Sequence, residues 1–282
     1  MNNFVQRTLS AIVYAGLVLT SILLQPQCFG GHPLLFGVLF LIVSTLAVRE
    51  FHVLVGSDVR LQSYAMIANA LLFTSLYFLF YGDGIWSALF VAYVAVMLLA
   101  LIAQLFREHS NPIQSWGNLC ASQMMVALPF ALMNGVLMHN RYLLLALFIL
   151  LWVNDSGAYI VGSLTAKLPK GNHKMFPRVS PAKSWEGLFG GVVFSLLAGY
   201  VFYRIGWTVE MGLTNSLLFA AIGSIVGTLG DLMESLFKRT LGVKDSGKFM
   251  PGHGGVLDRF DSLMLATPVV YFLFVYLANY LY

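Results

Sequence analysis

Acidic side chains near the ends of apolar segments are the residues of this sequence best suited to chemistry. Asp231, Glu234 and Lys238 are spaced i, i+3 and i+7, so one face of a helix would carry all three. Asp258 and Asp261 are spaced i, i+3, where a second helix should begin. Carboxylate oxygens without clustered cysteine or histidine are the ligands that Mg²⁺ and similar hard cations prefer. These acids therefore predict a site for a hard cation.

Each of these acids also has a structural explanation that needs no ligand. Lys238, near a membrane interface, would extend toward water and pair with Glu234. An acid in the first turn of a helix is stabilised by the helix dipole, which would account for Asp258 or Asp261. Asp231 lies deepest in its apolar segment, so it is the hardest of them to explain without a function.

A further carboxylate, Asp155, lies inside the apolar segment 142–165. It precedes the end of that segment by about ten residues, which corresponds to a depth of roughly 15 Å in a helix. An unpaired charge at this depth costs several kcal/mol, so Asp155 should face a polar cavity or a partner. Asn154 and Ser156 extend the polar patch and favour a functional cavity over a buried link between helices.

Basic residues gather in the same part of the sequence as the acids. We expect them to surround phosphate groups, with glycines 247, 252, 254 and 255 letting backbone N–H groups approach the phosphate oxygens. Each base alone is explained as an ordinary charge at a membrane surface, and only the clustering with the acids indicates a site. The basic residues are Lys183, Lys238, Arg239, Lys244, Lys248 and Arg259.

The elements that must position these residues are apolar helices. Hydrophobic residues make up 59% of the 282 residues and charged residues 10%, and the mean hydropathy is +0.79, which excludes a water-soluble globular domain. The net charge of +4 does not indicate nucleic-acid binding, and we expect no nucleic-acid partner. Segments of about 20 apolar residues cross a lipid bilayer as helices. The sequence predicts an all-α polytopic membrane protein with transmembrane helices at 8–25, 33–50, 62–81, 85–106, 117–138, 142–165, 185–204, 214–237 and 262–281.

The distribution of Lys and Arg predicts a cytoplasmic N-terminus. In this orientation the inner side holds 14 of the 16 positive residues, and only Arg141 and Arg204 lie outside. We expect Arg7 and residues 8–24 to begin a retained helix rather than a cleaved signal, because no small-x-small cleavage site precedes Cys28.

The inner loops divide the chain into regions of different expected roles. Two of them, 167–187 and the stretch 244–262 with its upstream helix end 230–242, hold most of the polar residues. We predict that residues 1–140 form N-terminal helices for scaffolding or dimerisation. Residues 141–282 are predicted to form the catalytic transmembrane region with its two cytoplasmic polar loops.

These polar loops contain several known motifs. The run SLFKRTLGVKDSGKFMPGHGGVLDRFD, residues 235–261, resembles the signature of the bacterial phosphatidate cytidylyltransferases, also called CDP-diacylglycerol synthases. Its departure is Met250, an apolar residue where that family usually carries Ile, Leu or Phe. The runs NDSGAY (154–159), VSPAKSWEG (179–187) and GDLMES (230–235) resemble other polar motifs of the family. The resemblance covers residues 150–262, and the first 140 residues match only as apolar helices.

The resemblance implies a Mg²⁺-dependent reaction of CTP with phosphatidic acid, which yields CDP-diacylglycerol and pyrophosphate for phospholipid biosynthesis. It also implies a multi-pass enzyme of the bacterial inner membrane that forms a homodimer and has its active site facing the cytoplasm. Asp231 and Asp258 match the metal-binding acids of the family, and Ser180, Pro181 and Lys183 match its Ser-Pro-x-Lys motif. A second cation is left open.

The residues and the resemblance together predict two groups of site residues. We expect the lipid phosphate, whose second pKa is about 6, to attack CTP without an obligatory general base. Positioning and electrostatics should then supply most of the rate. The predicted catalytic residues are Asp231, Asp258, Lys238, Lys244 and Arg259, and the predicted substrate-binding residues are Asp155, Ser180, Lys183, Glu186, Arg239, Asp245, His253, Gly254, Gly255 and Asp261.

Two other classes of function are left open by the sequence. A CTP-dependent lipid kinase, or a cytidylyltransferase for another lipid phosphate, would use similar polar loops. A transporter would use Asp155 and Asp231 as ion sites near the middle of the membrane, but it predicts broken helices and paired half-repeats that we do not find. The acyl chains of the lipid and the choice between CTP and dCTP are also left open.

Overall fold

Long apolar helices dominate the part of the chain that the computed structural model describes, which comprises residues 3–24, 32–108, 111–169, 171–247 and 254–276. Within these residues, 8 helices are long and apolar enough to cross a membrane, and a shorter apolar helix spans Ile12–Leu23. Every predicted apolar segment overlaps one of these helices, and residue 25 of the first segment and residues 277–281 of the last lie outside the described residues. The prediction of an all-α polytopic membrane protein is confirmed, and the orientation of the N-terminus stays a prediction.

The helices follow one another along the chain. The α-helices are α1 (Asn3–Leu23), α2 (Leu34–Leu54), α3 (Val59–Phe80), α4 (Trp86–Ile102), α5 (Pro112–Ser122), α6 (Leu128–His139), α7 (Arg141–Thr165), α8 (Trp185–Arg204), α9 (Gly212–Thr240) and α10 (Leu257–Val270). The short 3-10 and π segments are η2 (Ala103–Phe106), η3 (Gln123–Ala127), η4 (Val209–Met211) and η5 (Tyr271–Tyr276). The π segment η3 joins α5 to α6 in one apolar stretch, and η5 extends α10.

Polar side chains determine where several of the helices begin. The carboxylate of Asp58 accepts a hydrogen bond of 2.8 Å from the backbone N–H of Arg60 at the start of α3. Asn140 does the same for α7, and Ser184 for α8. Such caps satisfy backbone N–H groups that have no partner inside the helix.

The described chain divides into two compact units. The first unit comprises Met1–His139 and Asp245–Phe260, and the second comprises Asn140–Lys244 and Asp261–Tyr282. The division falls within α10, so the first turn of this helix belongs to the first unit and the remainder belongs to the second.

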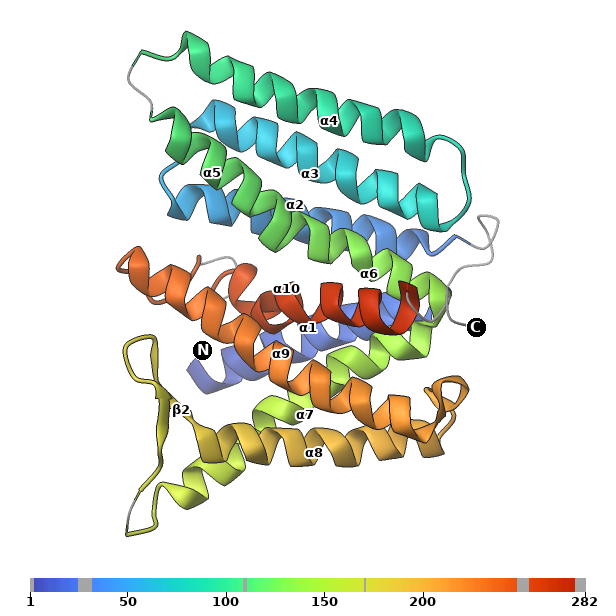
Figure 1. Cartoon of the computed structure of the whole chain (residues 1–282), viewed down its shortest axis with the longest axis vertical. Helices are drawn as coiled ribbons and strands as arrows, with labels where there is room; N and C mark the ends of the chain where they lie inside the picture. Colours follow the sequence, from blue (N-terminus) through green and yellow to red (C-terminus); the bar gives the residue numbers. More distant parts are fainter. Residues whose placement is uncertain (1–2, 25–31, 109–110, 170, 248–253, 277–282) are drawn as a thin grey trace. The chain divides into compact units, whose positions relative to one another are not determined.

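An aromatic cluster holds the first turn of α10 in the first unit. The rings of Phe40 and Phe130 have their centroids 5.9 Å and 5.0 Å from that of Phe260, and Phe36 stacks on Phe40 at 4.3 Å. All four side chains are buried. Figure 1 shows α2, α3 and α4 of this unit side by side. The end of the signature run 235–261, at Phe260, therefore packs against the N-terminal helices.

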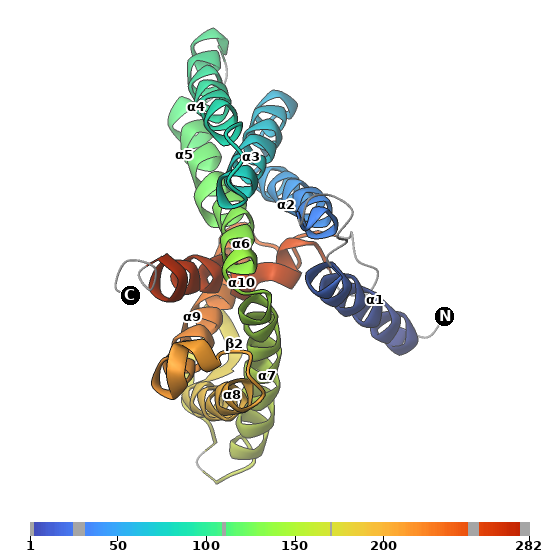
Figure 2. The ribbon, with the colours of Figure 1, turned by 90° about the vertical axis from the view of Figure 1, so that its right-hand side faces the viewer.

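Close contact between α7 and α8 organises the second unit. A Cβ atom at Gly157 would lie 2.7 Å from Phe194, and one at Gly187 would lie 3.1 Å from the carbonyl oxygen of Ala158. Glycine at these positions lets the two helices approach closely, as small residues do in membrane helix pairs. Figures 1 and 2 both show α7, α8 and α9 side by side.

A short β-hairpin precedes α8, and the sequence analysis did not predict it. Strand β1 (Lys174–Phe176) pairs antiparallel with β2 (Ser180–Ser184), and the backbone N–H of Trp185 donates to the carbonyl oxygen of His173. The stretch 167–187, expected to be an irregular loop, is therefore partly ordered as a sheet. This order fixes the direction of the β2 side chains relative to α7 and α8.

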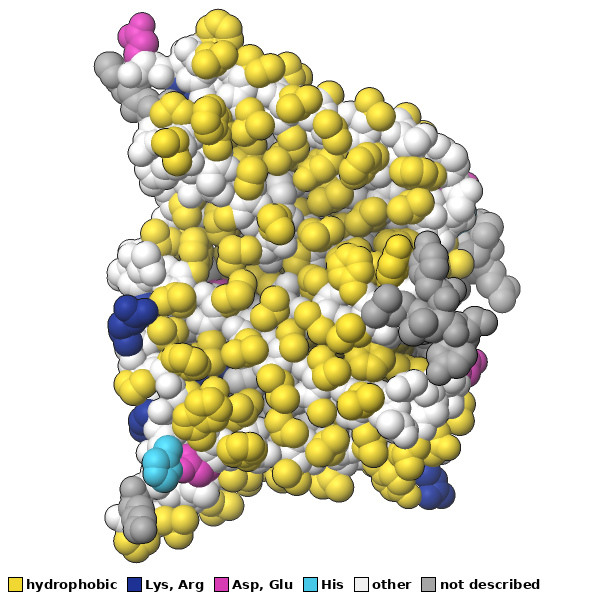
Figure 3. All heavy atoms as spheres, viewed as in Figure 1, with side chains coloured by type: hydrophobic (Ala, Val, Ile, Leu, Met, Phe, Trp, Pro, Cys, Tyr) yellow, Lys and Arg dark blue, Asp and Glu magenta, His cyan; other side chains and the backbone are white. Residues whose placement is uncertain are grey.

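The exposed surface is apolar along the helices. Val91 on α4 is 68% exposed and Leu197 on α8 is 61% exposed. On the face drawn in Figure 3, hydrophobic side chains cover the long sides of the helices, whereas charged side chains lie near the helix ends. This distribution is what a protein surrounded by lipid requires.

Candidate active site

A cavity in the second unit brings together residues that the sequence predicts to be functional. Its volume is about 370 Å³, and α7, the β-hairpin, α8 and α9 contribute to its lining. Asp155, Lys183 and Asp231 all border it, together with Lys174 and Thr228. Asp155 therefore borders this cavity, and its predicted role toward substrate stays a prediction.

An ion pair crosses this cavity from the hairpin to α9. The Nζ atom of Lys183 on β2 contacts Oδ2 of Asp231. The side chains are 22% and 26% exposed, so water reaches both of them. The sequence placed Lys183 in a polar loop and Asp231 near the inner end of a helix, and the fold brings them into direct contact.

Three carboxylates converge at the same end of α9. One oxygen from each of Asp231, Glu234 and Asp261 lies within 4.8 Å of the others. The i, i+3 spacing on α9 supplies the first two, and α10 supplies the third. Glycine at 230 permits this approach, because a Cβ atom there would lie 2.8 Å from the carbonyl oxygen of Asp261. An all-oxygen donor set of this kind fits a hard divalent cation.

A neighbouring lysine forms an ion pair with one of these carboxylates. Lys238 pairs with Glu234 one turn away on α9, as the structural explanation from the sequence predicted. Glu234 is buried, with 4% of its surface exposed, so the pair is shielded from water. Glu234 and Asp261 were among the acids that predicted a cation site, but Asp261 was then assigned to substrate binding and Glu234 was left out of the predicted site residues, because helical spacing alone does not reveal which acids meet across helices.

Asp258, the other predicted metal ligand, has several partners in the first unit. Its Oδ2 atom accepts hydrogen bonds from the backbone N–H of Ser246 (2.8 Å), the hydroxyl of Ser246 (3.0 Å) and the backbone N–H of Gly255 (2.7 Å). The first-turn position on α10 agrees with the prediction of where this helix begins. Asp231 belongs to the second unit, so the prediction that these two acids share a cation stays a prediction.

The glycines of the signature segment lie against carboxylates. Gly254 has a φ of +83°, and a Cβ atom there would lie 2.5 Å from Oδ2 of Asp258. A Cβ atom at Gly254 would also lie 3.6 Å from Cβ of Asp245, whose side chain is exposed. The sequence predicted that these glycines approach phosphates, and that role stays a prediction. His253 lies outside the described residues.

The remaining predicted bases differ in their surroundings. Arg239 donates from Nε to the carbonyl oxygen of Val179 at 3.4 Å, which connects α9 to the hairpin. Lys244 is exposed and belongs to the second unit. Arg259 is half-buried and belongs to the first unit. Their predicted contacts with phosphate stay predictions.

The Ser-Pro-x-Lys motif forms β2 and leads into α8. Ser180 begins the strand, and Glu186 lies in the first turn of the helix. The Glu186 carboxylate accepts hydrogen bonds from the backbone N–H of His173 at 3.1 Å and contacts its ring Nδ1 at 2.6 Å. Glu186 therefore holds the start of the hairpin against α8, and its predicted role toward substrate stays a prediction.

Asn154 has a structural role beside Asp155. Its Nδ2 donates to Oγ1 of Thr228 at 3.1 Å, and its Oδ1 accepts from Oγ of Ser224 at 2.5 Å. These bonds link α7 to α9 in the buried interior. Asp155, the next residue, turns toward the cavity, so this link sets the position of the cavity wall.

Comparison with known proteins decides the family. The model of the cytidylyltransferase family matches residues 5–277. The chain belongs to the cytidylyltransferase family. The resemblance found in the polar motifs is thereby confirmed, and the match includes the N-terminal helices, which those motifs did not cover.

Three relatives illustrate this membership of a family of nucleotidyltransferases. A phosphatidate cytidylyltransferase of Pseudomonas aeruginosa is 35% identical over 270 residues, which cover 89% of this chain and 93% of the relative. One of Bacillus subtilis is 35% identical over 205 residues, covering 72% and 73%. One of Haemophilus influenzae is 44% identical over 133 residues, and that alignment covers 46% of this chain and 44% of the relative. This alignment therefore spans less than half the length of the Haemophilus influenzae protein.

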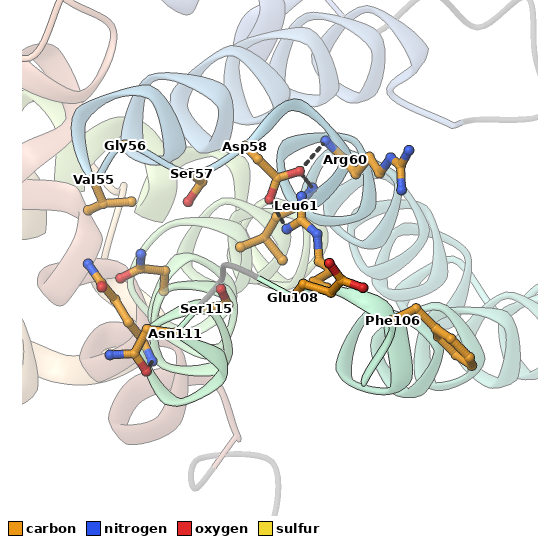
Figure 4. A pocket seen from close by; sticks show the side chains of 13 residues that line it. Val55, Gly56, Ser57, Asp58, Arg60, Leu61, Phe106, Glu108, Asn111 and Ser115 are labelled. Carbon is orange, nitrogen blue, oxygen red and sulfur yellow. Dashed lines mark hydrogen bonds and ion pairs between the residues drawn. The ribbon is translucent and has the colours of Figure 1, made fainter. Parts of the chain in front are cut away.

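A second cavity of this cytidylyltransferase-family chain lies in the first unit. Its volume is about 600 Å³, and it is bordered by the start of α3, the residues after η2 and the start of α5. Figure 4 shows Asp58 and Arg60 on one wall, with Glu108 and Asn111 opposite. Although this cavity is larger, it contains none of the predicted site residues. The smaller cavity of the second unit is therefore the candidate active site.

An ion pair stabilises the wall of this larger cavity. Arg107 contacts the Asp58 carboxylate, which also caps α3. Burial raises the pKa of the Asp58 carboxyl, but the hydrogen bonds from Arg107 and from the backbone N–H groups of Leu61 and Arg60 outweigh burial. The pKa of Asp58 therefore lies below its usual value of 3.8. The same hydrogen bond raises the pKa of Arg107.

Proposed function

We propose that this protein transfers a cytidylyl group from CTP to phosphatidic acid, releasing pyrophosphate and forming CDP-diacylglycerol. The observation that carries the proposal is the cavity of the second unit, where Lys183 and Asp231 meet beside Asp155. Relatives named phosphatidate cytidylyltransferase that align over most of the chain support this choice of substrates. We extend the proposal to a role in phospholipid biosynthesis.

The donor set supports a requirement for Mg²⁺. Asp231, Glu234 and Asp261 would hold the cation, since their oxygens already converge and no soft ligand lies among them. Asp258 is proposed as a further ligand on the resemblance alone. When bound, Mg²⁺ neutralises the phosphates of CTP and the charge that develops on the departing pyrophosphate.

Lysines beside the acids would orient the two anionic substrates. Lys183 extends from β2 into the cavity, and Lys174 on β1 borders the same space. A triphosphate and a lipid phosphate repel each other, so positive side chains are needed to hold them together. In the free protein Asp231 balances the charge of Lys183, and a phosphate oxygen would compete for this lysine.

The reaction needs no side chain that removes a proton from the nucleophile. The attacking group is the phosphate of phosphatidic acid, whose second pKa is about 6, so it is largely ionised at neutral pH. One of its oxygens forms a bond to the α-phosphorus of CTP while the bond to the bridging oxygen of pyrophosphate breaks. The chain would therefore contribute mainly by positioning both substrates and stabilising charge.

The location of the site follows from its substrates. The headgroup of the lipid lies at the membrane interface and CTP is soluble, so the cavity must be reached from both. The predicted orientation puts the hairpin and the end of α9 on the cytoplasmic side, and the relatives are bacterial. We propose the bacterial inner membrane as the location, with the site facing the cytoplasm and with a homodimer as the assembly.

The proposal is tested by product analysis with detergent-purified protein. The protein is incubated with phosphatidic acid and Mg²⁺, and with CTP labelled either in the cytidine or in the γ-phosphate. Cytidine label in the lipid and γ-label in pyrophosphate support cytidylyl transfer. Transfer of the γ-label to lipid would instead identify a CTP-dependent lipid kinase.

Further controls distinguish cytidylyl transfer to phosphatidic acid from the remaining candidate functions. Lipid phosphates with a different backbone, used in place of phosphatidic acid, identify a cytidylyltransferase for another lipid if they react faster. The variant Asp231→Asn should form no labelled lipid, which excludes a contaminating enzyme. Absence of any labelled product from wild-type protein in both detergent and liposomes would contradict the proposal and favour a transporter.

A further inference from the structure

A carboxylate of the N-terminal helices contacts the signature segment of the family. Glu50 lies near the end of α2, and its Oε2 atom accepts a hydrogen bond from the Ser246 hydroxyl at 3.2 Å and from the backbone N–H of Leu257 at 3.1 Å. These partners follow Glu50 by about two hundred positions in the chain, and all three residues belong to the first unit. The sequence analysis assigned no role to Glu50.

Glu50 and Asp258 hold the same two parts of the backbone. The Ser246 hydroxyl lies within hydrogen-bonding distance of both carboxylates, 3.2 Å from Glu50 and 3.0 Å from Asp258. At the end of the segment, Leu257 donates to Glu50 and Gly255 donates to Asp258. The two carboxylates share the Ser246 hydroxyl and otherwise accept from neighbouring backbone N–H groups, so Glu50 holds the residues that orient Asp258.

Two glycines of the signature make room for Glu50. A Cβ atom at Gly247 would lie 2.6 Å from Oε1 of Glu50, and one at Gly255 would lie 2.5 Å from its Oε2. The same Cβ atom at Gly255 would overlap Oγ of Ser246. Neither glycine has a positive φ, so close approach rather than backbone conformation explains them. Gly247 and Gly255 therefore leave the space that the Glu50 carboxylate of α2 occupies.

We infer that Glu50 is a positioning residue, which sets the conformation of residues 246–247 and 254–257 and thereby the direction of the Asp258 carboxylate. The inference rests on the proposed function, in which Asp258 acts in the site. It gives the N-terminal helices a specific part in the reaction beyond scaffolding. The partners of Glu50 are N–H and O–H donors, so its role requires acceptor oxygens at this position.

The test compares two substitutions that remove different numbers of acceptors. Glu50→Ala removes both contacts, whereas Glu50→Gln keeps one side-chain oxygen that can accept from Ser246 and Leu257 as Oε2 does, but without its negative charge. We expect kcat/KM for cytidylyl transfer to fall about 10- to 100-fold in Glu50→Ala, as for residues that orient metal ligands. Glu50→Gln should lie between this variant and the wild type. Glu108→Ala, which removes an exposed acid of the same unit, serves as the matched control and should retain wild-type activity.

A second measurement follows the segment itself and needs no substrate. Trypsin cuts after Lys244 and Arg259, which lie just outside the Glu50 contacts at Ser246 and Leu257, and mass spectrometry gives the rate of cleavage at these sites. Loss of the Glu50 contacts should speed this cleavage at least about tenfold in Glu50→Ala and less in Glu50→Gln, because cleavage tracks local opening. The melting temperature of Glu50→Gln and of Glu108→Ala should stay close to that of the wild type.

Each outcome decides for or against the inference. Faster cleavage with lower kcat/KM, graded from Ala to Gln, supports it. Wild-type cleavage and wild-type kcat/KM in both variants would overturn it, as would a uniform loss of melting temperature in Glu50→Gln without faster cleavage at these two sites. If wild-type protein makes no CDP-diacylglycerol, the proposed function fails, and the cleavage rates still show whether Glu50 holds the segment. If Glu50→Ala does not fold, Glu50→Gln alone decides.

Discussion

Gly230 offers a sharp test of how the carboxylate site is built. This residue lies on α9 directly before Asp231, and the backbone of α10 passes over it. A Cβ atom at this position would lie 2.8 Å from the carbonyl oxygen of Asp261 and 3.0 Å from that of Ser262. Both are backbone atoms and cannot rotate away, so Gly230→Ala must push the two helices apart. The change would separate Asp231 from Asp261.

The magnitude follows from two opposing contributions. Overpacking of a tight interior contact costs up to about 3 kcal/mol. Replacement of glycine by alanine inside a helix returns about 1 kcal/mol. The expected net loss is about 2 kcal/mol, which corresponds to a fall in melting temperature of about 4–8 °C.

Gly223 provides a matched control on the same helix. A Cβ atom there would also meet a neighbour at 2.8 Å, but this neighbour is Cδ2 at the end of the Leu150 side chain. A change of rotamer costs about 1 kcal/mol, so it nearly cancels the gain in helix propensity. Gly223→Ala should therefore melt within about 2 °C of the wild type.

The assay combines thermal unfolding of detergent-purified protein with cytidylyl transfer. Gly230→Ala should lose both melting temperature and activity, and the lost activity should persist well below its melting temperature because the acids are displaced. Gly223→Ala should keep both. Equal melting temperatures and activities for the two variants would refute the close packing of α9 on α10 at the site.

Three other predictions concern single side chains. Lys183→Ala should lower kcat/KM for CTP about 100-fold, as expected for loss of one charge that stabilises the transferred phosphate, and an unchanged value would make Lys183 an ordinary surface charge. Asp258→Asn keeps an oxygen for the donors Ser246 and Gly255 but loses its charge, so turnover should cease with little change in melting temperature, whereas activity within severalfold of wild type would remove Asp258 from the metal site. The Asp58 carboxyl has a lowered pKa, so its contribution to stability is complete above its usual pKa of 3.8 and is lost as the pH falls through the folded-state value. The difference in melting temperature between wild type and Asp58→Asn should therefore shrink below pH 3.8, and parallel pH profiles would contradict this reasoning.

Hydropathy predicts the helices well because lipid leaves the backbone few alternatives. A segment inside the membrane must satisfy its own N–H and C=O groups, so an apolar run of sufficient length becomes a helix. The predicted segment 142–165 corresponds to α7, Arg141–Thr165, and 185–204 corresponds to α8, Trp185–Arg204. The local spacing of Asp231 and Glu234 on α9 was equally predictable, since helix geometry alone fixes it.

Contacts between distant segments were not predictable in this way. The strands β1 and β2 are short and lack an alternating pattern, so the hairpin that directs Lys183 into the cavity carries no clear sequence signal. Glu50 is a lone acid at the end of an apolar segment, where a charge at the membrane surface is a sufficient explanation. Its role depends on Ser246 and Leu257, and only the tertiary fold brings these residues to it.

The most direct measurement of the central claim is binding of Mn²⁺, as a spectroscopic substitute for Mg²⁺, to the carboxylates of α9 and α10. Electron paramagnetic resonance gives the amount of free Mn²⁺ during a titration of detergent-purified protein without substrates. The account predicts that wild-type protein binds Mn²⁺, and that Asp231→Asn and Asp261→Asn each weaken the affinity at least about tenfold while Glu108→Gln does not. Equal affinities for all four proteins would contradict a cation site formed by these acids.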